Sequence, residues 1–123
     1  MVHKFRELKV WQRAMLFTVE VYRESQKFPS DERFGLVSQF RRAVCGIPLN
    51  IAEGAGCTTN KDFCRFLSIA LRQGYETMTA TEIARGLAYW PDDTCNRLNK
   101  EVDEIIAMTA GLMKSLGWPF GDR

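Results

Sequence analysis

Apolar side chains recur every three or four residues along most of this chain of 123 residues, which is the spacing of amphipathic helices. The first such segment is predicted to run from about Phe5 to Gln26. It carries two neighbouring apolar stripes, one made of Leu8, Trp11, Met15, Thr18 and Tyr22, and the other of Val10, Ala14, Phe17 and Val21. This helix is therefore apolar on two sides.

Turn and capping residues separate the first helix from a second one. Phe28-Pro29-Ser30 interrupts the first apolar pattern. Ser30 is a suitable N-cap, because its side chain can accept a hydrogen bond from a backbone N–H of the first turn. The second helix is then predicted to continue to about Glu53, since Gly54-Ala55-Gly56 favours a helix end.

Two further helices follow. The third is predicted to begin at Thr58-Thr59-Asn60, where Thr59 and Asp62 have the spacing of a capping box. It ends near Trp90, ahead of a proline. The fourth begins at Asp92 and ends before Gly117. No segment shows the strict alternation of a β-strand.

These four helices predict an all-α protein. The connections are short, so consecutive helices should be antiparallel, and the expected architecture is an up-down-up-down antiparallel four-helix bundle. The length suits a single domain, residues 1–123, that is large enough to bury a core.

Pro48 lies in the middle of the predicted second helix. Proline removes one backbone hydrogen bond there and costs about 3 kcal/mol unless the site uses the resulting irregularity. The reason could be the architecture, a binding site, or both.

The third helix has an unusual face of small residues, namely Ala70, Gly74, Thr77, Thr81, Ala84 and Ala88. Small residues in a row let another helix approach closely. Larger apolar residues occupy a different face. Together with the two-sided first helix, this pattern would leave an apolar strip in water on a lone bundle. Because exposed strips of this kind usually mark an interface, we expect a homo-oligomer.

A polar stripe on the second helix is the main candidate site. Gln39, Asn50 and Glu53 share one face at helical spacing, opposite an apolar stripe. Glu76 of the third helix lies among core-type residues, and a buried carboxylate needs a partner. Gln39, Asn50, Glu53 and Glu76 are therefore expected to form either a structural polar network or a ligand pocket.

Cations of the second and third helices form a candidate nucleic-acid-binding strip, made of Arg41, Arg42, Lys61, Arg65 and Arg72. Phosphate binding requires only such cations at the surface. The net charge of +2 is small, however, and nucleic-acid-binding proteins usually have a denser basic face. Ordinary surface charges and salt-bridge partners are the alternative.

The sequence offers little for catalysis. His3 is the only histidine, which leaves no Cys–His pair and no Glu-x-x-His metal ligands. Four cysteines without Cys-x-x-Cys spacing favour reduced thiols. There is no phosphate-binding glycine loop and no apolar run long enough to span a membrane. We expect no enzymatic activity, no metal or other cofactor, no membrane contact and a cytoplasmic location.

Several segments of the chain resemble the four-helix bundle proteins called 23S rRNA intervening-sequence proteins. The matching segments are Phe5-Arg6-Glu7-Leu8-Lys9-Val10-Trp11-Gln12-Arg13-Ala14, Phe28-Pro29, Phe34-Gly35-Leu36, Gln39-Phe40-Arg41-Arg42-Ala43, Asn50-Ile51-Ala52-Glu53-Gly54, Phe63, Arg65-Phe66-Leu67 and Ala70. The resemblance covers nearly the whole chain, and the Asn-Ile-Ala-Glu-Gly segment is specific in that context.

The resemblance implies an up-down bundle that assembles as a cyclic pentamer, with no enzymatic activity. The family is also similar to the accessory protein of diversity-generating retroelements, a pentamer that works with a reverse transcriptase and nucleic acid. This chain departs from the family pattern at Gly46 and Gln73, where the family usually has serine. It also departs at Leu49, Cys57 and Arg72, and these departures weigh against pocket chemistry around the second and third helices.

RNA or nucleoprotein binding through the basic strip is the leading functional hypothesis. The alternative is a protein-binding assembly scaffold without nucleic-acid contact. Salt dependence separates the two, because phosphate contacts weaken linearly with the logarithm of the salt concentration and protein contacts need not.

Overall fold

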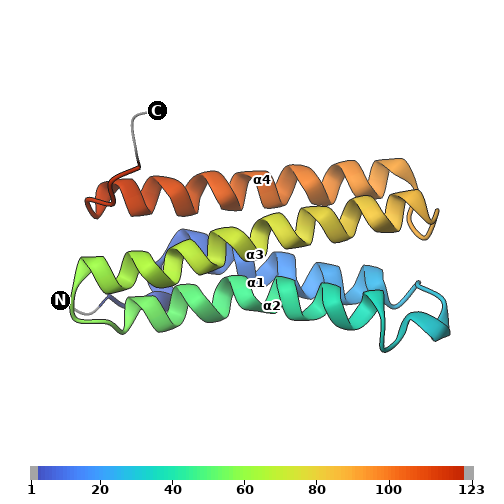
Figure 1. The fold of residues 1–123 in the computed structure, drawn as a ribbon, viewed down its shortest axis with the longest axis horizontal. Coiled ribbons are helices and arrows are strands. Elements are labelled where there is room, and N and C mark those ends of the chain that lie inside the picture. The colour runs from blue at the N-terminus through green and yellow to red at the C-terminus, as the bar shows by residue number, and fades with distance from the viewer. Residues whose placement is uncertain (1–2, 121–123) are drawn as a thin grey trace.

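The computed structural model describes residues 3–120, and four long helices account for most of them. They are α1 (Lys9–Ser25), α2 (Leu36–Ala55), α3 (Asn60–Gly86) and α4 (Asp92–Ser115). Consecutive helices run in opposite directions along one long axis (Figure 1). No strand occurs between residues 3 and 120. The predicted all-α four-helix bundle is confirmed. The outermost residues of the expected domain, 1–2 and 121–123, lie outside the described part.

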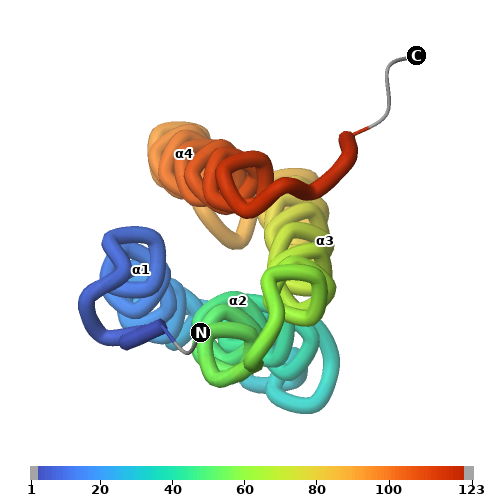
Figure 2. Tube along the Cα trace, turned by 90° about the vertical axis from the view of Figure 1, so that its left-hand side faces the viewer, coloured from blue at the N-terminus to red at the C-terminus, as the bar shows by residue number. Residues whose placement is uncertain are grey.

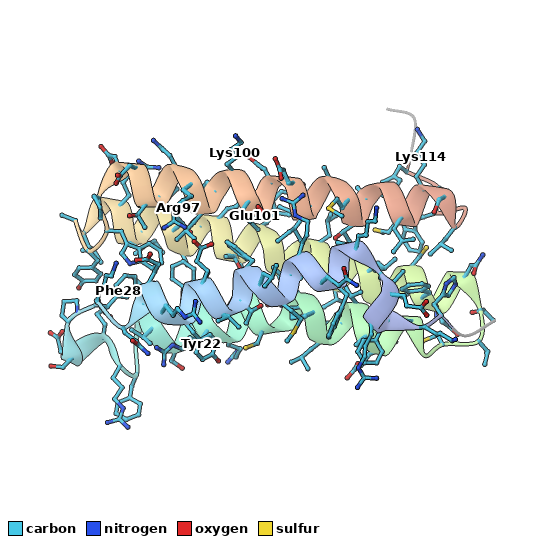
Figure 3. The ribbon with its side chains drawn as sticks, turned by 180° about the vertical axis from the view of Figure 1, so that it is seen from behind. Tyr22, Phe28, Arg97, Lys100, Glu101 and Lys114 are labelled. Atoms are coloured by element: carbon cyan, nitrogen blue, oxygen red, sulfur yellow. The ribbon has the colours of Figure 1, made fainter. Side chains whose placement is uncertain are left out.

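The four helices do not contact one another equally. Seen along the axis, α2 lies between α1 and α3, and α4 packs on α3 (Figure 2). Long charged side chains connect α1 to α4: Arg13 Nη2 is 2.6 Å from Glu101 Oε1, and Arg97 pairs with Glu20 and Glu24. Arg97 and Glu101 lie between these two helices in Figure 3. The contact between α1 and α4 is thus the least extensive between neighbouring helices of the described chain, and these ion pairs reinforce it.

The starts of the first two helices differ from the prediction. Phe5–Glu7 is a separate 3-10 turn, and Leu8 is extended, so α1 begins only at Lys9. Ser30–Glu32 is likewise a 3-10 turn, and α2 begins at Leu36. Glu32 takes the capping role expected of Ser30, because its Oε1 accepts the Leu36 N–H at 3.0 Å. This bond and one from the Tyr89 hydroxyl lower the pKa of Glu32.

The predicted cap of α3 is confirmed, since Thr59 Oγ1 accepts the Asp62 N–H at 3.1 Å. The helix ends at Gly86, four residues before Trp90, and Ala88 has a left-handed φ of 58°. The reversal carries Trp90 into the core, where its Nε1 donates to Glu24 O at 2.9 Å. Its ring centroid lies 4.7 Å from that of Phe28 and 5.1 Å from that of Phe40. Aromatic packing thus closes this end of the bundle.

Glycines set the separation between neighbouring helices. A Cβ at Gly46 would lie 2.8 Å from the Gln73 side chain, and one at Gly54 would lie 2.8 Å from the Phe63 ring, so α2 and α3 approach closely at both points. A Cβ at Gly74 would meet Ile106 of α4 at 2.8 Å. Most of the small-residue face of α3 is buried in the subunit, including Thr77 and Ala84. That face is therefore used inside the bundle, where α4 approaches it closely, and it is not part of an exposed apolar strip.

Pro48 has an architectural explanation. It is buried within α2, and its missing N–H leaves the Val44 carbonyl without the usual helical donor. Thr18 of α1 is buried, and its single hydroxyl proton is shared between Ala14 O at 2.7 Å and Val44 O at 3.3 Å. The hydroxyl of α1 thereby partly replaces the donor that Pro48 lacks, and the contact ties the two helices together.

We expect Thr18→Val to lower the free energy of unfolding by about 1–3 kcal/mol, because it leaves a buried carbonyl without a donor. Thr109→Val is the matched control. Thr109 is also buried but donates only to Ile105 O in its own helix. A backbone N–H of that helix remains available to Ile105 O, so Thr109→Val should lower the free energy of unfolding less. Urea denaturation measures both. In a Pro48→Ala background the Thr18→Val effect should shrink; an undiminished effect there would contradict the compensation.

Candidate functional site

The polar stripe of α2 does not form a buried network in the subunit. Gln39, Glu53 and Glu76 are exposed. Asn50 is half-buried, and its Nδ2 donates to Gly46 O at 2.7 Å on its own helix. No hydrogen bond or ion pair joins any two of these four side chains within residues 3–120. The expectation that Glu76 lies among core residues is wrong, because the buried face of α3 passes through its neighbour Thr77.

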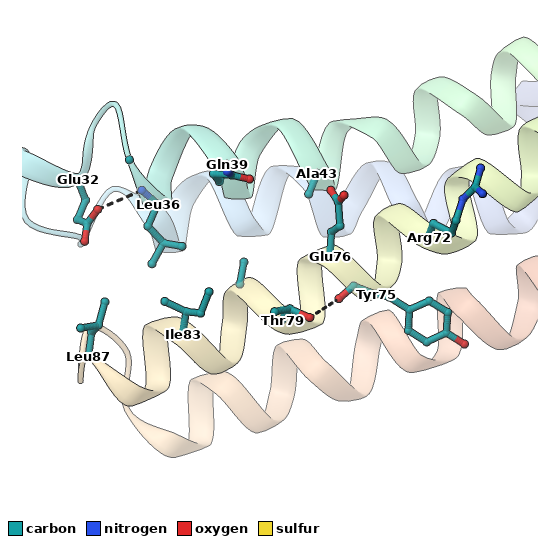
Figure 4. Close-up of a pocket in the computed structure, with 12 residues that line it drawn as sticks. Glu32, Leu36, Gln39, Ala43, Arg72, Tyr75, Glu76, Thr79, Ile83 and Leu87 are labelled. Carbon is teal, nitrogen blue, oxygen red and sulfur yellow. Dashed lines mark hydrogen bonds between the residues drawn. The ribbon is translucent and has the colours of Figure 1, made fainter.

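Two of these four residues instead line a groove between α2 and α3. Gln39 and Glu76 lie beside Ala43 in this groove (Figure 4), which has a volume of about 760 Å³. Its lining becomes apolar toward the α1–α2 loop, where it includes Leu36, Ala80, Ile83 and Leu87. The groove exists because Ala43 and Ala80 have short side chains where the two helices face solvent.

A second hollow extends across α2 from Tyr22 of α1 to Glu76 of α3. The predicted residues Arg41, Arg42 and Asn50 also line it. The Arg41 guanidinium lies 4.6 Å from the Tyr22 ring centroid, and it donates to Ser25 Oγ and to Tyr22 O. The Tyr22 hydroxyl lies 3.2 Å from Cys45 Sγ, and this contact together with burial raises the pKa of Tyr22. Arg41 is thus held against α1 and is not a free surface cation.

The other predicted cations differ in whether their side chains form ion pairs or hydrogen bonds. Arg42, Lys61 and Arg72 are exposed, and their side chains have no ion pair or hydrogen bond in the described chain. Arg65 is also exposed, but its Nη1 lies 3.3 Å from Asp62 Oδ1. Lys61, Arg65 and Arg72 follow one outer face of α3. The structure therefore retains a basic strip on α3, while Arg41 is engaged elsewhere.

The tertiary structure adds basic residues that the sequence analysis missed. The backbone N–H of His3 donates to Ala55 O at 2.9 Å, which places the N-terminal segment at the α2–α3 end of the bundle, together with the C-terminus of α4 (Figure 1). Residues 3–9, 53–65 and 111–120 carry the cations Lys4, Arg6, Lys9, Lys61, Arg65 and Lys114 and the anions Glu7, Glu53 and Asp62. We call this region the basic end.

Several cations at the opposite end of the bundle form ion pairs. Lys27 pairs with Glu24, Arg85 with Glu82 and Asp92, and Arg97 with Glu20 and Glu24. At the basic end only Arg65 has an ion pair among the described residues. Unpaired cations attract phosphates most strongly because no protein carboxylate competes for them. The only sequence signal for this segregation was the excess of Lys and Arg in the first 42 residues.

The described residues contain no cluster of His, Cys, Asp and Glu suited to a metal ion. All four cysteines are free thiols. Cys64 and Cys95 are buried, and burial raises the pKa of both. None of the helices in the described part is long and apolar enough to cross a membrane.

The fold and surface define a small helical-bundle protein whose candidate sites are exposed grooves and charged surfaces. A family model described as 23S rRNA-intervening sequence protein matches residues 6–111, so the chain belongs to that family. A crystal structure of a protein of unknown function from the S23 ribosomal protein family of Bacteroides thetaiotaomicron has a similar fold. The TM-score is 0.77 at 23% sequence identity, over 85% of this chain and 98% of the other. No curated protein sequence matches this chain.

Because Glu53 is exposed and has no partner in the described chain, Glu53→Ala should change the free energy of unfolding by less than about 0.5 kcal/mol. A buried network would instead predict a loss of about 1–3 kcal/mol. Urea denaturation of the two proteins in parallel distinguishes these outcomes. Asn50→Ala is the comparison, because Asn50 does have a hydrogen bond to lose.

Proposed function

We propose that this protein is a non-enzymatic, cytoplasmic, oligomeric bundle that binds RNA or a nucleoprotein complex. The observation that supports this most directly is the group of exposed, unpaired cations at the basic end, which continues along α3 to Arg72. Lysine and arginine side chains of this kind bind phosphates and release counterions, largely without regard to base sequence. The family is similar to the accessory protein of diversity-generating retroelements, which works with a reverse transcriptase and nucleic acid. A nucleoprotein partner is therefore part of the same proposal.

The surface favours weak binding by a single subunit. A few cations neutralise only a few phosphates. In a cyclic oligomer the basic ends would recur around the ring, so one long RNA could contact several of them and bind more tightly than any single site allows. The pentamer implied by the family resemblance would supply this repetition. The proposal therefore joins assembly and RNA binding.

The oligomer has a direct test. Light scattering at micromolar concentration should give a mass several times the 14.1 kDa of one chain, and a pentamer would give five times that value. The physical reason is the number of large apolar side chains that a lone subunit exposes, including Leu16 and Leu49. A mass of one chain at all accessible concentrations would contradict the assembly.

RNA binding is tested by titration with structured and single-stranded RNA at several salt concentrations. The triple variant Lys61→Glu, Arg65→Glu and Arg72→Glu should weaken binding at least tenfold. It should also reduce the dependence of log affinity on log salt, because each lost phosphate contact lowers that slope by roughly 0.7 to 0.9.

A second triple variant controls for net charge, namely Lys27→Glu, Arg33→Glu and Lys100→Glu. These cations are exposed and lie outside the basic end and the α3 strip, so binding should fall much less than in the first variant. Equal losses of RNA affinity in the two variants would show that net charge alone, and not the position of the cations, controls binding. If the unmodified protein binds no RNA even at low salt, the scaffold alternative replaces the RNA hypothesis.

A further inference from the structure

A hollow at the basic end places an aromatic side chain next to a lysine. It has a volume of about 420 Å³ and lies between the start of α3 and the end of α4. Its lining includes Cys64, Leu116, Trp118 and Pro119, together with Lys61, and no acidic side chain of the described chain lines it. Small-molecule sites have volumes of roughly 300–1,000 Å³, so the hollow has room for a planar ring.

The end of α4 determines where Trp118 lies. Gly117 has a left-handed φ of 91°, which glycine adopts without a steric cost. Its N–H donates to Lys114 O at 3.1 Å, and the N–H of Trp118 donates to Met113 O at 3.0 Å. This pair of bonds is the Schellman ending of a helix. It turns the chain out of the helix and holds the backbone of Trp118 at the edge of the hollow.

Trp118 is half-buried, and part of its side chain packs against the core. Its indole N–H forms no hydrogen bond and its ring has no aromatic or cationic neighbour within residues 3–120. The other two tryptophans differ, because Trp90 is buried and donates to Glu24 O, and Trp11 packs edge-on against Phe5. Trp118 is therefore the tryptophan whose ring is available to a ligand.

Another hollow adjoins the first and has a similar lining. It has a volume of about 470 Å³, shares Trp118 and Pro119 with the first, and is bordered by Lys114 and by Phe120, which is 45% exposed. Lys114 extends into solvent from the last turn of α4 (Figure 3). Neither Lys61 nor Lys114 has an ion pair or hydrogen bond in the described chain. Unpaired ammonium groups therefore border both of the hollows that Trp118 lines.

We propose that the basic end binds single-stranded RNA, with one base stacked on the Trp118 ring and neighbouring phosphates on Lys61 and Lys114. This inference rests on the proposed function and names the form of RNA that the site selects. Every base has an aromatic face, so stacking on Trp118 is largely independent of base sequence. Paired bases of a duplex are not splayed out to stack on a side chain. Stacking therefore adds affinity for unpaired segments, which phosphate contacts alone do not provide.

RNA probes that differ in bases and in pairing separate stacking from phosphate contacts. They are a short single-stranded oligouridylate, the same chain with abasic riboses, and an adenine–uracil duplex of equal length. The oligouridylate should quench the tryptophan fluorescence of the protein at low salt, because the stacked base covers the Trp118 ring. The abasic chain should not quench it. Trp118→Phe should abolish the quenching while retaining most of the affinity, since a phenyl ring still stacks.

Substitutions assign the contacts. Trp118→Leu keeps an apolar side chain without a ring, and it should weaken oligouridylate binding by about fivefold to a hundredfold and leave binding of the abasic chain and the duplex unchanged. Lys61→Gln with Lys114→Gln should instead weaken binding of all the probes. Phe34→Leu is the control, because Phe34 is 88% exposed and lies at the opposite end of the bundle, and it should change none of the affinities.

Trp118 follows the last helix, so its variants should keep the helical circular dichroism of the unmodified protein. Oligouridylate binding that survives Trp118→Leu, or that is no more sensitive to this change than abasic binding, would refute the stacking site. RNA binding at the basic end would then stand without it. If the unmodified protein binds none of the probes at low salt, the proposed RNA binding fails and the stacking site with it.

Discussion

The path of α2 is the constraint on which the other helices depend. This helix has to contact α3 through glycines and α1 through larger apolar side chains, and it contains a proline between the glycine contacts at Gly46 and Gly54. The carbonyl that Pro48 leaves without a helical donor faces Thr18 of α1. One irregular turn therefore fixes the register of α1 against α2 while close packing fixes the distance from α2 to α3.

The remaining arrangement follows from that pair of contacts. The helix α3 uses its small residues against α4, with Gly74 against Ile106, so α4 is placed mainly by α3. Its contact with α1 is less extensive, and long charged side chains reinforce it. A hollow therefore remains between α1 and α4, lined by Leu16 and Val19. This hollow and the groove between α2 and α3 are two consequences of the same asymmetric packing.

Two departures from the family pattern also become intelligible in the structure. Gly46 and Gln73 stand where the resemblance leads one to expect serines, and the Gln73 side chain occupies the space that a Cβ at residue 46 would need. The two positions are therefore coupled through a shared volume between α2 and α3. A larger residue at one position is accommodated by the absence of a side chain at the other, which preserves helix spacing without any requirement for pocket chemistry.

The four helices, the all-α bundle and the cap at Thr59 were predictable from the sequence, because helical periodicity and capping are local properties of a few consecutive residues. It misplaced the helix starts at Phe5 and Ser30, where 3-10 turns satisfy the same polar groups, and it overestimated the burial of Glu53 and Glu76. Periodicity tells which residues share a face but not which face meets which helix. Three features became visible only in the folded chain: the small-residue face of α3 is buried, Thr18 partly replaces the donor missing at Pro48, and distant cations gather at one end. Each depends on residues far apart in sequence that packing brings together.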